Sequence, residues 1–342
     1  MGLYRKGKGF GKNWTIAAAG FFLSPYLLLA DDVPVAPIRT QVYGDLAGVY
    51  VLKNERVEVV IDPSVGRVVS LKHIGKNNLL TMRRPQQSSR DWFDYGGSWF
   101  FPVAQEHWIR LQDEKWPPPP GVDGIAWKAH GWKNADGTLN CLLETTLGDR
   151  LQLKCSRQFS LIPGKSEILV KQELQRLDAS VVPAVLWNGC QVNRPDRLVL
   201  PLNRKSLFPK GYQLIAGELL QPLIVCSNLA VCVTDSLVEG KIGTDAPDQW
   251  IGAVSGDELL LQQVLTLQPP HGHPNDGCGI QAYINQGLAY ADIEVLSPVS
   301  ELAVGQVIKN VIKLSLHHID SEWNDCRLAA EVKKRLGGEL VP

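Results

Sequence analysis

Apolar and polar side chains alternate with a period of two along most of the chain after residue 45. Residues 48–74 contain such runs, broken by turn residues at 53–55 and 62–66. Alternation of this kind predicts strands with one buried face. Further strand-like segments lie at 139–147, 150–160, 166–173, 184–187, 223–234, 250–254, 258–267, 289–296 and 307–316. The pattern predicts an all-β domain made of two stacked antiparallel sheets.

Helical periodicity is confined to the C-terminal end of the chain. Residues 321–336 show it, with Ser321 as the candidate N-cap and Gly337-Gly338 as the stop. The segments 82–123 and 192–217 lack a clear strand pattern and are expected to be irregular insertions. We therefore expect one β domain at 45–316, preceded by a linker at 31–44 and followed by a short helix and tail at 317–342.

The first thirty residues have the order of a secretory signal peptide. Arg5, Lys6, Lys8 and Lys12 form a basic start, residues 14–29 carry no charge, and the small residue Ala30 precedes two aspartates. We expect cleavage near Ala30 and a periplasmic or extracellular product. The alternative is an uncleaved membrane anchor, although the apolar stretch is shorter than the ~20 residues of a bilayer span.

The overall composition is that of a globular protein. The 342 residues include 35 Lys+Arg and 35 Asp+Glu, and 44% are hydrophobic, which excludes a disordered or collagenous chain. Nucleic-acid binding is disfavoured, because such binding needs a surplus of clustered basic residues.

All seven cysteines lie after residue 140, and none forms a Cys-x-x-Cys pair, so the spacing does not fit a zinc site. Export would permit disulfides, and Cys226 and Cys232 are close enough in sequence to meet across a bend. The apolar runs around both residues support the alternative equally well, namely that they are small buried side chains.

Tryptophans are concentrated between residues 92 and 132, where six of the ten lie. An aromatic face can stack on the C–H face of a sugar ring while neighbouring polar side chains bind the hydroxyl groups. Trp99 and Trp108 flank Gln105, Glu106 and His107 and are the candidates for such a pocket. About half of the tryptophans in this segment are expected to be structural.

Motifs at both ends of the predicted domain resemble the galactose mutarotase-like (aldose 1-epimerase) superfamily. Residues 54–71, NERVEVVIDPSVGRVVSL, resemble its opening strand pair, and residues 291–306, ADIEVLSPVSELAVGQ, resemble its strand-borne glutamate and the turn that follows. The segments YGGSWFFPVAQEHW, KIGTD and YADIEVLSP resemble an uncharacterised branch of exported proteins in that superfamily. The resemblance covers about residues 45–316 and implies a β-supersandwich.

The resemblance also implies a chemistry. Mutarotases open and reclose a sugar ring with a general base and a general acid. Glu294 falls on the family's catalytic glutamate. The histidine that supplies the acid has no counterpart, since residues 186–191 read LWNGCQ and Gln191 cannot donate and recover a proton near neutral pH. Trp187 and Gln191 are expected to contact the sugar.

Histidines elsewhere are candidates for the missing acid, namely His107, His271 and His273, and His273 is also expected to contact the sugar. His271 and His273 with Asp276 and Cys278 have the residue types of a metal site. The prolines and glycines among them favour a solvated or ligand-lining loop instead. We expect neither a metal ion nor a cofactor.

Several charged residues near the family motifs could belong either to the site or to structural ion pairs. Asp292 and Glu294 lie on one face of the same strand and could form a glycosidase pair, as could Glu294 with Asp245. Arg67 either points into the pocket or pairs with Glu58. Lys241 and Asp245 either hold sugar hydroxyls or form a surface ion pair.

Three functional classes remain. The first is an exported carbohydrate-binding protein that takes a mono- or oligosaccharide without robust turnover, and the missing histidine favours it. The second is an epimerase or related carbohydrate-active enzyme that uses Glu294 as its base. The third is a structural envelope protein. A membrane would be a partner only if the N-terminal segment stays uncleaved.

Overall fold

The computed structural model describes residues 34–85, 92–236, 239–266, 268–269 and 271–336. The predicted signal peptide and its cleavage site near Ala30, and the predicted helix stop at Gly337-Gly338, lie outside these residues. None of the helices in the described ranges has the length and apolar character that crossing a membrane requires.

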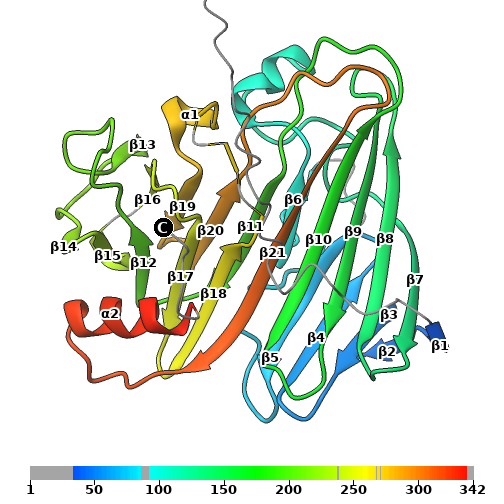
Figure 1. Ribbon diagram of the computed structural model, residues 1–342, viewed down its shortest axis with the longest axis horizontal. Coiled ribbons are helices and arrows are strands. Elements are labelled where there is room, and N and C mark those ends of the chain that lie inside the picture. The colour runs from blue at the N-terminus through cyan, green and yellow to red at the C-terminus, as the bar shows by residue number, and fades with distance from the viewer. Residues whose placement is uncertain (1–33, 86–91, 237–238, 267, 270, 337–342) are drawn as a thin grey trace, which may run out of the picture. The chain divides into compact units, whose positions relative to one another are not determined.

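Two large antiparallel sheets make up the described chain (Figure 1). The eleven-stranded sheet contains, in spatial order, β1 (Pro34–Ile38), β7 (Lys128–Asn134), β8 (Leu139–Leu147), β9 (Leu153–Leu161), β10 (Glu167–Arg176), β21 (Val307–His318), β18 (Glu258–Val264), β17 (Trp250–Ser255), β12 (Arg197–Pro201), β15 (Leu229–Val233) and β14 (Ile224–Cys226).

The ten-stranded sheet contains, in spatial order, β13 (Gln213–Gly217), β16 (Glu239–Thr244), β19 (Ile280–Asn285), β20 (Tyr290–Leu296), β11 (Trp187–Asn193), β6 (Ser98–Phe101), β5 (Arg67–His73), β4 (Val57–Asp62), β3 (Leu46–Lys53) and β2 (Gln41–Tyr43). Short helices interrupt the strands at η2 (Gln105–Arg110), η3 (Thr234–Ser236) and α1 (Pro274–Gly277), and α2 (Asp325–Arg335) follows the last strand. The predicted fold class, an all-β two-sheet sandwich with a short C-terminal helix, is confirmed.

The main core lies between the two sheets and follows the predicted alternation. Ile242, Ala282 and Ile293 of the ten-stranded sheet belong to the same buried cluster as Leu260 and Leu314 of the eleven-stranded sheet. Since successive side chains on a strand point to opposite faces, the residues between these core positions lie on the other face of the ten-stranded sheet. That face carries the candidate site.

Several strands differ from the sequence prediction. The segment 82–123, expected to be irregular, contains the inner strand β6, and 192–217 contains β12 and β13. All four residues of β6 are buried, so the strand lacks the polar alternation that would identify it. Strands β7, β16 and β19 were also not predicted. Strands β1 and β2 lie within residues 31–44, the predicted linker, and each is paired into a sheet.

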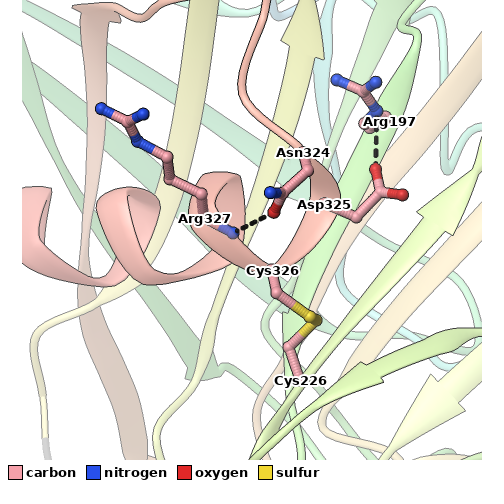
Figure 2. Close-up of a disulfide and its surroundings, with 6 residues drawn as sticks. All are labelled: Arg197, Cys226, Asn324, Asp325, Cys326 and Arg327. Atoms are coloured by element: carbon pink, nitrogen blue, oxygen red, sulfur yellow. Dashed lines mark hydrogen bonds and ion pairs between the residues drawn. A yellow bond between two sulfur atoms is a disulfide. The ribbon is translucent and has the colours of Figure 1, made fainter.

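The C-terminal helix begins later than predicted. Asn324, not Ser321, is the N-cap of α2, and its side-chain Oδ1 accepts a hydrogen bond from the backbone N–H of Arg327 at 3.0 Å (Figure 2). Leu328, Ala329 and Val332 bury the inner face of the helix against the outer side of β15, β17 and β18.

A disulfide links this helix to the sheet through Cys226 on β14 and Cys326 on α2 (Figure 2). Arg197 supports the same contact, since its Nε lies 2.8 Å from Asp325 Oδ1. The Cys226–Cys232 pairing considered from sequence does not occur. Cys232 points into the core between the sheets, whereas Cys226 packs with the residues that contact α2.

Candidate functional site

Strand register gathers polar side chains on the outer face of the ten-stranded sheet. One row of cross-strand neighbours contains Lys241 on β16, Tyr283 on β19, Asp292 on β20 and Gln191 on β11. The next row contains Glu294, opposite Gly189. Neighbours in such a row are about 5 Å apart. Residues distant in sequence therefore form one continuous surface.

This surface is the floor of a cavity of about 480 Å³. Its walls are largely aromatic, and the rings belong to Trp92, Trp99, Phe101, Trp116, Trp187, Tyr283 and Tyr290. Its polar lining comprises Arg67, Asp94, Gln105, Gln191, Glu239, Lys241, Asn285, Asp292 and Glu294. An apolar cavity of this size with a few convergent polar groups is typical of a small-molecule site.

Two described residues hold Glu294 through one of its two carboxylate oxygens. Lys241 Nζ lies 2.7 Å from Oε2, and Trp187 Nε1 donates to the same atom at 2.9 Å. Lys241 Nζ also lies 4.8 Å from the centroid of the Trp187 ring, a cation–π contact. Among the described residues no donor reaches Oε1. This oxygen is therefore available to a ligand in the cavity.

Asp292 is the second carboxylate of the floor, and it has a different environment. Trp99 Nε1 donates to its Oδ1 at 3.2 Å, and no described residue donates to Oδ2. Burial raises the pKa of the Asp292 carboxyl to about 8, and the nearby charges of Glu294 and Asp94 act in the same direction. Asp292 thus holds a proton near neutral pH. The pocket contains one carboxyl that can give a proton and one that is held by a lysine.

Trp99 reaches Asp292 because β11 has a glycine beneath its ring. A Cβ atom on Gly189 would lie 2.1 Å from the Trp99 indole, which is far inside van der Waals contact. Trp99 also stacks on Phe101, with ring centroids 4.5 Å apart, and meets the edge of Trp187. It is 6% exposed, so its main role in the described structure is to support the floor.

Two arginines brace the wall formed by residues 92–97. Arg67 donates to the Gly96 carbonyl at 2.5 Å and forms a bidentate pair with Asp123 at 2.5 and 2.6 Å. Arg83 contacts Asp94 Oδ2 at 2.6 Å and Gln191 Oε1 at 2.5 Å. The Arg67 side chain is therefore paired with Asp123, not with Glu58 as one sequence interpretation had it.

A hydrogen-bonded group lies at the β16–β19 side of the cavity. Tyr283 donates to Glu239 Oε1 at 2.8 Å, and Asn285 Nδ2 donates to the Tyr283 hydroxyl oxygen at 3.0 Å. Burial raises the pKa of Tyr283 to about 12. The tyrosine is therefore a hydrogen-bonding group rather than an ionised one near neutral pH.

Among the described residues of the lining, acidic groups outnumber basic groups. The carboxyl groups are Asp94, Glu239, Asp292 and Glu294, against the two cations Arg67 and Lys241, each already paired with a carboxylate. An anionic ligand would therefore find no unpaired cation in the described lining.

Seven of the residues predicted from sequence line this cavity together: Arg67, Trp99, Gln105, Trp187, Gln191, Lys241 and Glu294. Some of these side chains already have partners. Gln191 is bonded to Arg83 and to Asp94, and Gln105 Nε2 donates to the Lys115 carbonyl at 3.2 Å.

Four predicted residues lie outside the lining. Trp108 is 0% exposed and packs in the core with Phe101 and Trp187. His107 lies in η2, 3.5 Å from Glu106, and burial lowers its pKa. Asp245 binds the 206–207 loop, accepting from Ser206 Oγ and the Leu207 N–H at 2.7 Å each.

His273, the fourth, contacts Gln249 at 2.8 Å, and burial lowers its pKa to about 4. His273 is the N-cap of the four-residue helix α1, in which Asn275 and Asp276 have non-helical backbone angles. The segment from His271 to Cys278 is therefore a loop that contains one irregular turn. Within the described part of the cavity lining there is no histidine.

Sequence reasoning did not single out several lining residues. Trp92 and Trp116 belong to the tryptophan-rich segment but were not chosen over Trp108. Trp116 is 54% exposed, and its ring meets that of Trp92 at 4.9 Å between centroids. Asp292 was considered from sequence only as the partner of Glu294 in a glycosidase pair and was not chosen as a site residue, because burial, which alters its chemistry, is not visible in the sequence.

No family model matches the sequence, and no curated protein sequence matches it. Solved structures do match. Galactose 1-epimerase from Lactobacillus acidophilus NCFM is 10% identical, with a TM-score of 0.52 over 84% of this chain and 100% of that one. A galactose mutarotase-like protein from Lactobacillus casei ATCC 334 is 12% identical, with a TM-score of 0.52 over 79% of this chain and 100% of that one.

A third match, a galactose mutarotase-like protein from Clostridium acetobutylicum, is 12% identical, with a TM-score of 0.52 over 82% of this chain and 98% of that one. At these identities the likeness concerns the fold. The resemblance predicted from the sequence motifs is confirmed at that level: this chain has the galactose mutarotase-like fold.

Proposed function

We propose that this protein binds a neutral sugar in the cavity on the outer face of the ten-stranded sheet. The observation that carries the proposal is the combination of the half-buried Trp92 and the exposed Trp116 with two carboxyl groups, each of which has one oxygen that no described residue bonds. Indole faces stack on sugar C–H groups, and carboxyl oxygens accept hydrogen bonds from hydroxyl groups. The galactose mutarotase-like fold is consistent with such a ligand.

The charge of the lining supports a neutral ligand over an acidic one. Bringing a uronate or a sugar phosphate beside Asp94, Glu239 and Glu294 would place like charges together at low dielectric. Both cations of the described lining already neutralise a carboxylate. A neutral hexose or a neutral chain end fits this balance.

An exported location is part of the proposal. It rests on the order of basic, apolar and small residues in the first thirty positions. The Cys226–Cys326 disulfide supports it, because such bonds form and persist in oxidising compartments.

A sugar panel followed by NMR tests the binding proposal. We expect saturation transfer to neutral hexoses and their oligomers, and much weaker transfer to glucuronate and sugar phosphates. Equal signals for acidic and neutral sugars would contradict the charge argument. Absence of any sugar signal, on monosaccharides and polymeric glycans alike, would overturn the proposal in favour of a structural role.

A second function, sugar epimerisation at the anomeric carbon, is favoured by the two carboxyl groups on β20. Glu294 would take the proton of the anomeric hydroxyl as the C1–O5 bond breaks and a C1 carbonyl forms. The protonated Asp292 carboxyl would give its proton to the ring oxygen. Reclosure on the other face of the carbonyl returns both protons and gives the other anomer.

Anomer exchange measured by NMR separates the two functions. An epimerase accelerates the α/β interconversion of a reducing sugar that binds, and both Glu294→Gln and Asp292→Asn abolish the acceleration. A binding protein broadens the sugar resonances without faster exchange, and Asp292→Asn then changes affinity alone. In the epimerase case, full exchange activity in Asp292→Asn would remove that residue from the role of acid.

A further inference from the structure

A cluster of two histidines and a glutamate lies at one end of the sandwich, apart from the sugar cavity. His73 Nδ1 is 2.5 Å from Glu258 Oε2, and His318 Nδ1 is 2.7 Å from Glu258 Oε1. The three donor atoms all lie within 4.8 Å of one another. The two imidazole rings stack with their centroids 4.3 Å apart and their planes inclined by 20°.

Each ligand comes from the end of a different strand. His73 is the last residue of β5 in the ten-stranded sheet, whereas Glu258 begins β18 and His318 ends β21 in the eleven-stranded sheet. Glu258 and His318 are direct cross-strand neighbours. Figure 1 shows β21 ending at the lower edge of the view, beside the turn that joins β17 and β18. The cluster therefore joins the two sheets.

The hydrogen bonds of the described residues leave one carboxylate oxygen of this cluster unsatisfied. Glu258 is 6% exposed, so its charge is largely removed from water. His73 bonds to Oε2, but no described residue forms a hydrogen bond with Oε1, although His318 Nδ1 lies 2.7 Å away. His318 Nδ1 and Glu258 Oε1 are close to each other, but their orientation does not meet the geometry of a hydrogen bond. A buried carboxylate oxygen in this state is costly unless a cation neutralises it.

The nearby charged side chains do not meet that need. Lys76 Nζ is 4.0 Å from Glu258 Oε1 and only 2.8 Å from Asp257 Oδ2, so the lysine is paired with the aspartate. Lys76 and Asp257 are both exposed to solvent. A cation placed between the two imidazoles and Oε1 would contact all three donor groups at once.

We propose that His73, Glu258 and His318 bind a divalent transition-metal ion, with zinc as the first candidate. Two imidazole nitrogens and one carboxylate oxygen are a donor set that zinc accepts, with bonds of about 2.0–2.2 Å. Small movements of the largely exposed His318 ring would separate the donor atoms enough for each to reach the ion. His318 borders solvent, so water can complete the coordination.

The proposed metal ion would stabilise the fold and would have no direct contact with the sugar cavity. Arg67, which lines the cavity, and His73 stand at opposite ends of β5, about 20 Å apart along the strand. An ion held by one ligand from one sheet and two from the other would tie the sheets together at this end. Sugar binding is therefore expected to proceed without the metal.

Zinc titration of untagged, EDTA-treated full-length protein tests the proposal. We expect one equivalent of zinc to bind by calorimetry, and the melting temperature to rise by roughly 4 °C at a zinc concentration one hundred times Kd. Cobalt in place of zinc should give the visible absorption of a site with nitrogen and oxygen ligands. The five cysteines outside the disulfide are buried and should not compete.

Variants locate the ion. His318→Ala, at a largely exposed side chain, and Glu258→Gln, which keeps the shape of the residue, should each weaken zinc binding at least about 10-fold. His130→Ala, at an exposed histidine on β7, is the control and should bind as the parent does. Lack of zinc binding by the parent protein would overturn the site, and so would undiminished binding by His318→Ala and Glu258→Gln.

Discussion

Lys241 and Glu294 form a buried ion pair on the floor of the sugar cavity, with Nζ 2.7 Å from Oε2 and side-chain exposures of 11% and 3%. The two residues belong to β16 and β20, which are not adjacent strands, because β19 lies between them. The pair therefore bridges three strands and fixes the orientation of the carboxylate that faces the ligand.

Removing the lysine should destabilise the protein strongly. Lys241→Met leaves the Glu294 carboxylate buried without its cation, and breaking a buried pair in this way costs about 3–5 kcal/mol in the free energy of unfolding. Urea denaturation followed by fluorescence measures this. The double variant Lys241→Met, Glu294→Gln should recover part of the loss, and a single variant as stable as the parent would refute the argument.

Trp116 should contribute to sugar affinity without contributing much to stability. Its ring is 54% exposed at the cavity, so Trp116→Ala removes stacking area while the core stays intact. We expect affinity for the best neutral sugar to fall about 10-fold, a change of about 1.4 kcal/mol. Trp132→Ala on β7, away from the cavity, is the matched control and should bind sugar normally. Equal affinities in the two variants would remove Trp116 from the site.

Gly189 should tolerate no side chain. A Cβ atom there would overlap the Trp99 indole at 2.1 Å, so Gly189→Ala must displace the ring that bonds to Asp292. We expect a loss of about 1–3 kcal/mol in stability from the overpacking. Sugar binding should weaken as well, because the floor of the cavity moves. Thermal unfolding and sugar titration of the same sample measure both effects, and an unperturbed variant would show that Trp99 can move freely.

Asp292 should make stability fall as pH rises. Its pKa is raised from 3.8 to about 8 on folding, so between these values the folded protein holds a proton that the unfolded chain has lost. This stabilising contribution is complete below about pH 4 and is lost as pH increases through about 8. Asp292→Asn should remove the slope.

The comparison of parent and Asp292→Asn is needed because other groups titrate in the opposite sense. Burial lowers the pKa of His317 to about 4, so its contribution to stability is lost as pH falls from about 6.5 towards 4. Subtracting the denaturation curves of the two proteins at each pH isolates Asp292. A difference that does not change between pH 4 and 9 would contradict the raised pKa.

The disulfide should stabilise the C-terminal helix. Cys226 and Cys326 are separated by 100 residues, and a disulfide typically contributes about 2–4 kcal/mol to the free energy of unfolding. The double variant Cys226→Ser, Cys326→Ser should lose that amount in urea denaturation and should become insensitive to dithiothreitol. If the parent protein is equally stable with and without dithiothreitol, the bond contributes nothing.

Much of the fold could be predicted from the sequence, and the reason is the alternation along the strands. Residues 139–147 were predicted as a strand and form β8 with the same bounds. Alternation also placed Asp292 and Glu294 on one face of one strand, and both line the cavity. Strand β6 escaped prediction because all four of its residues are buried, so it carries no periodic signal.

The site was harder to predict, because the choice among similar residues depends on tertiary packing. Trp108 and Trp116 lie eight residues apart in one aromatic segment, yet the first is in the core and the second at the cavity. Asp245 follows the strand that carries Lys241, but its carboxylate is used by the 206–207 loop. The partner of Cys226 lies on a helix 100 residues away, so local spacing could not identify it.

The disulfide also lies at one edge of the eleven-stranded sheet. Strand β14 is the last strand of its sheet, and its outer backbone groups would offer a template to a strand of another molecule. The bond anchors α2 beside that strand. In chains that have folded but not yet oxidised, non-covalent contacts such as the packing of Leu328, Ala329 and Val332 alone would hold α2 beside β14. We therefore expect this edge to be more open to pairing with another molecule before oxidation than after it.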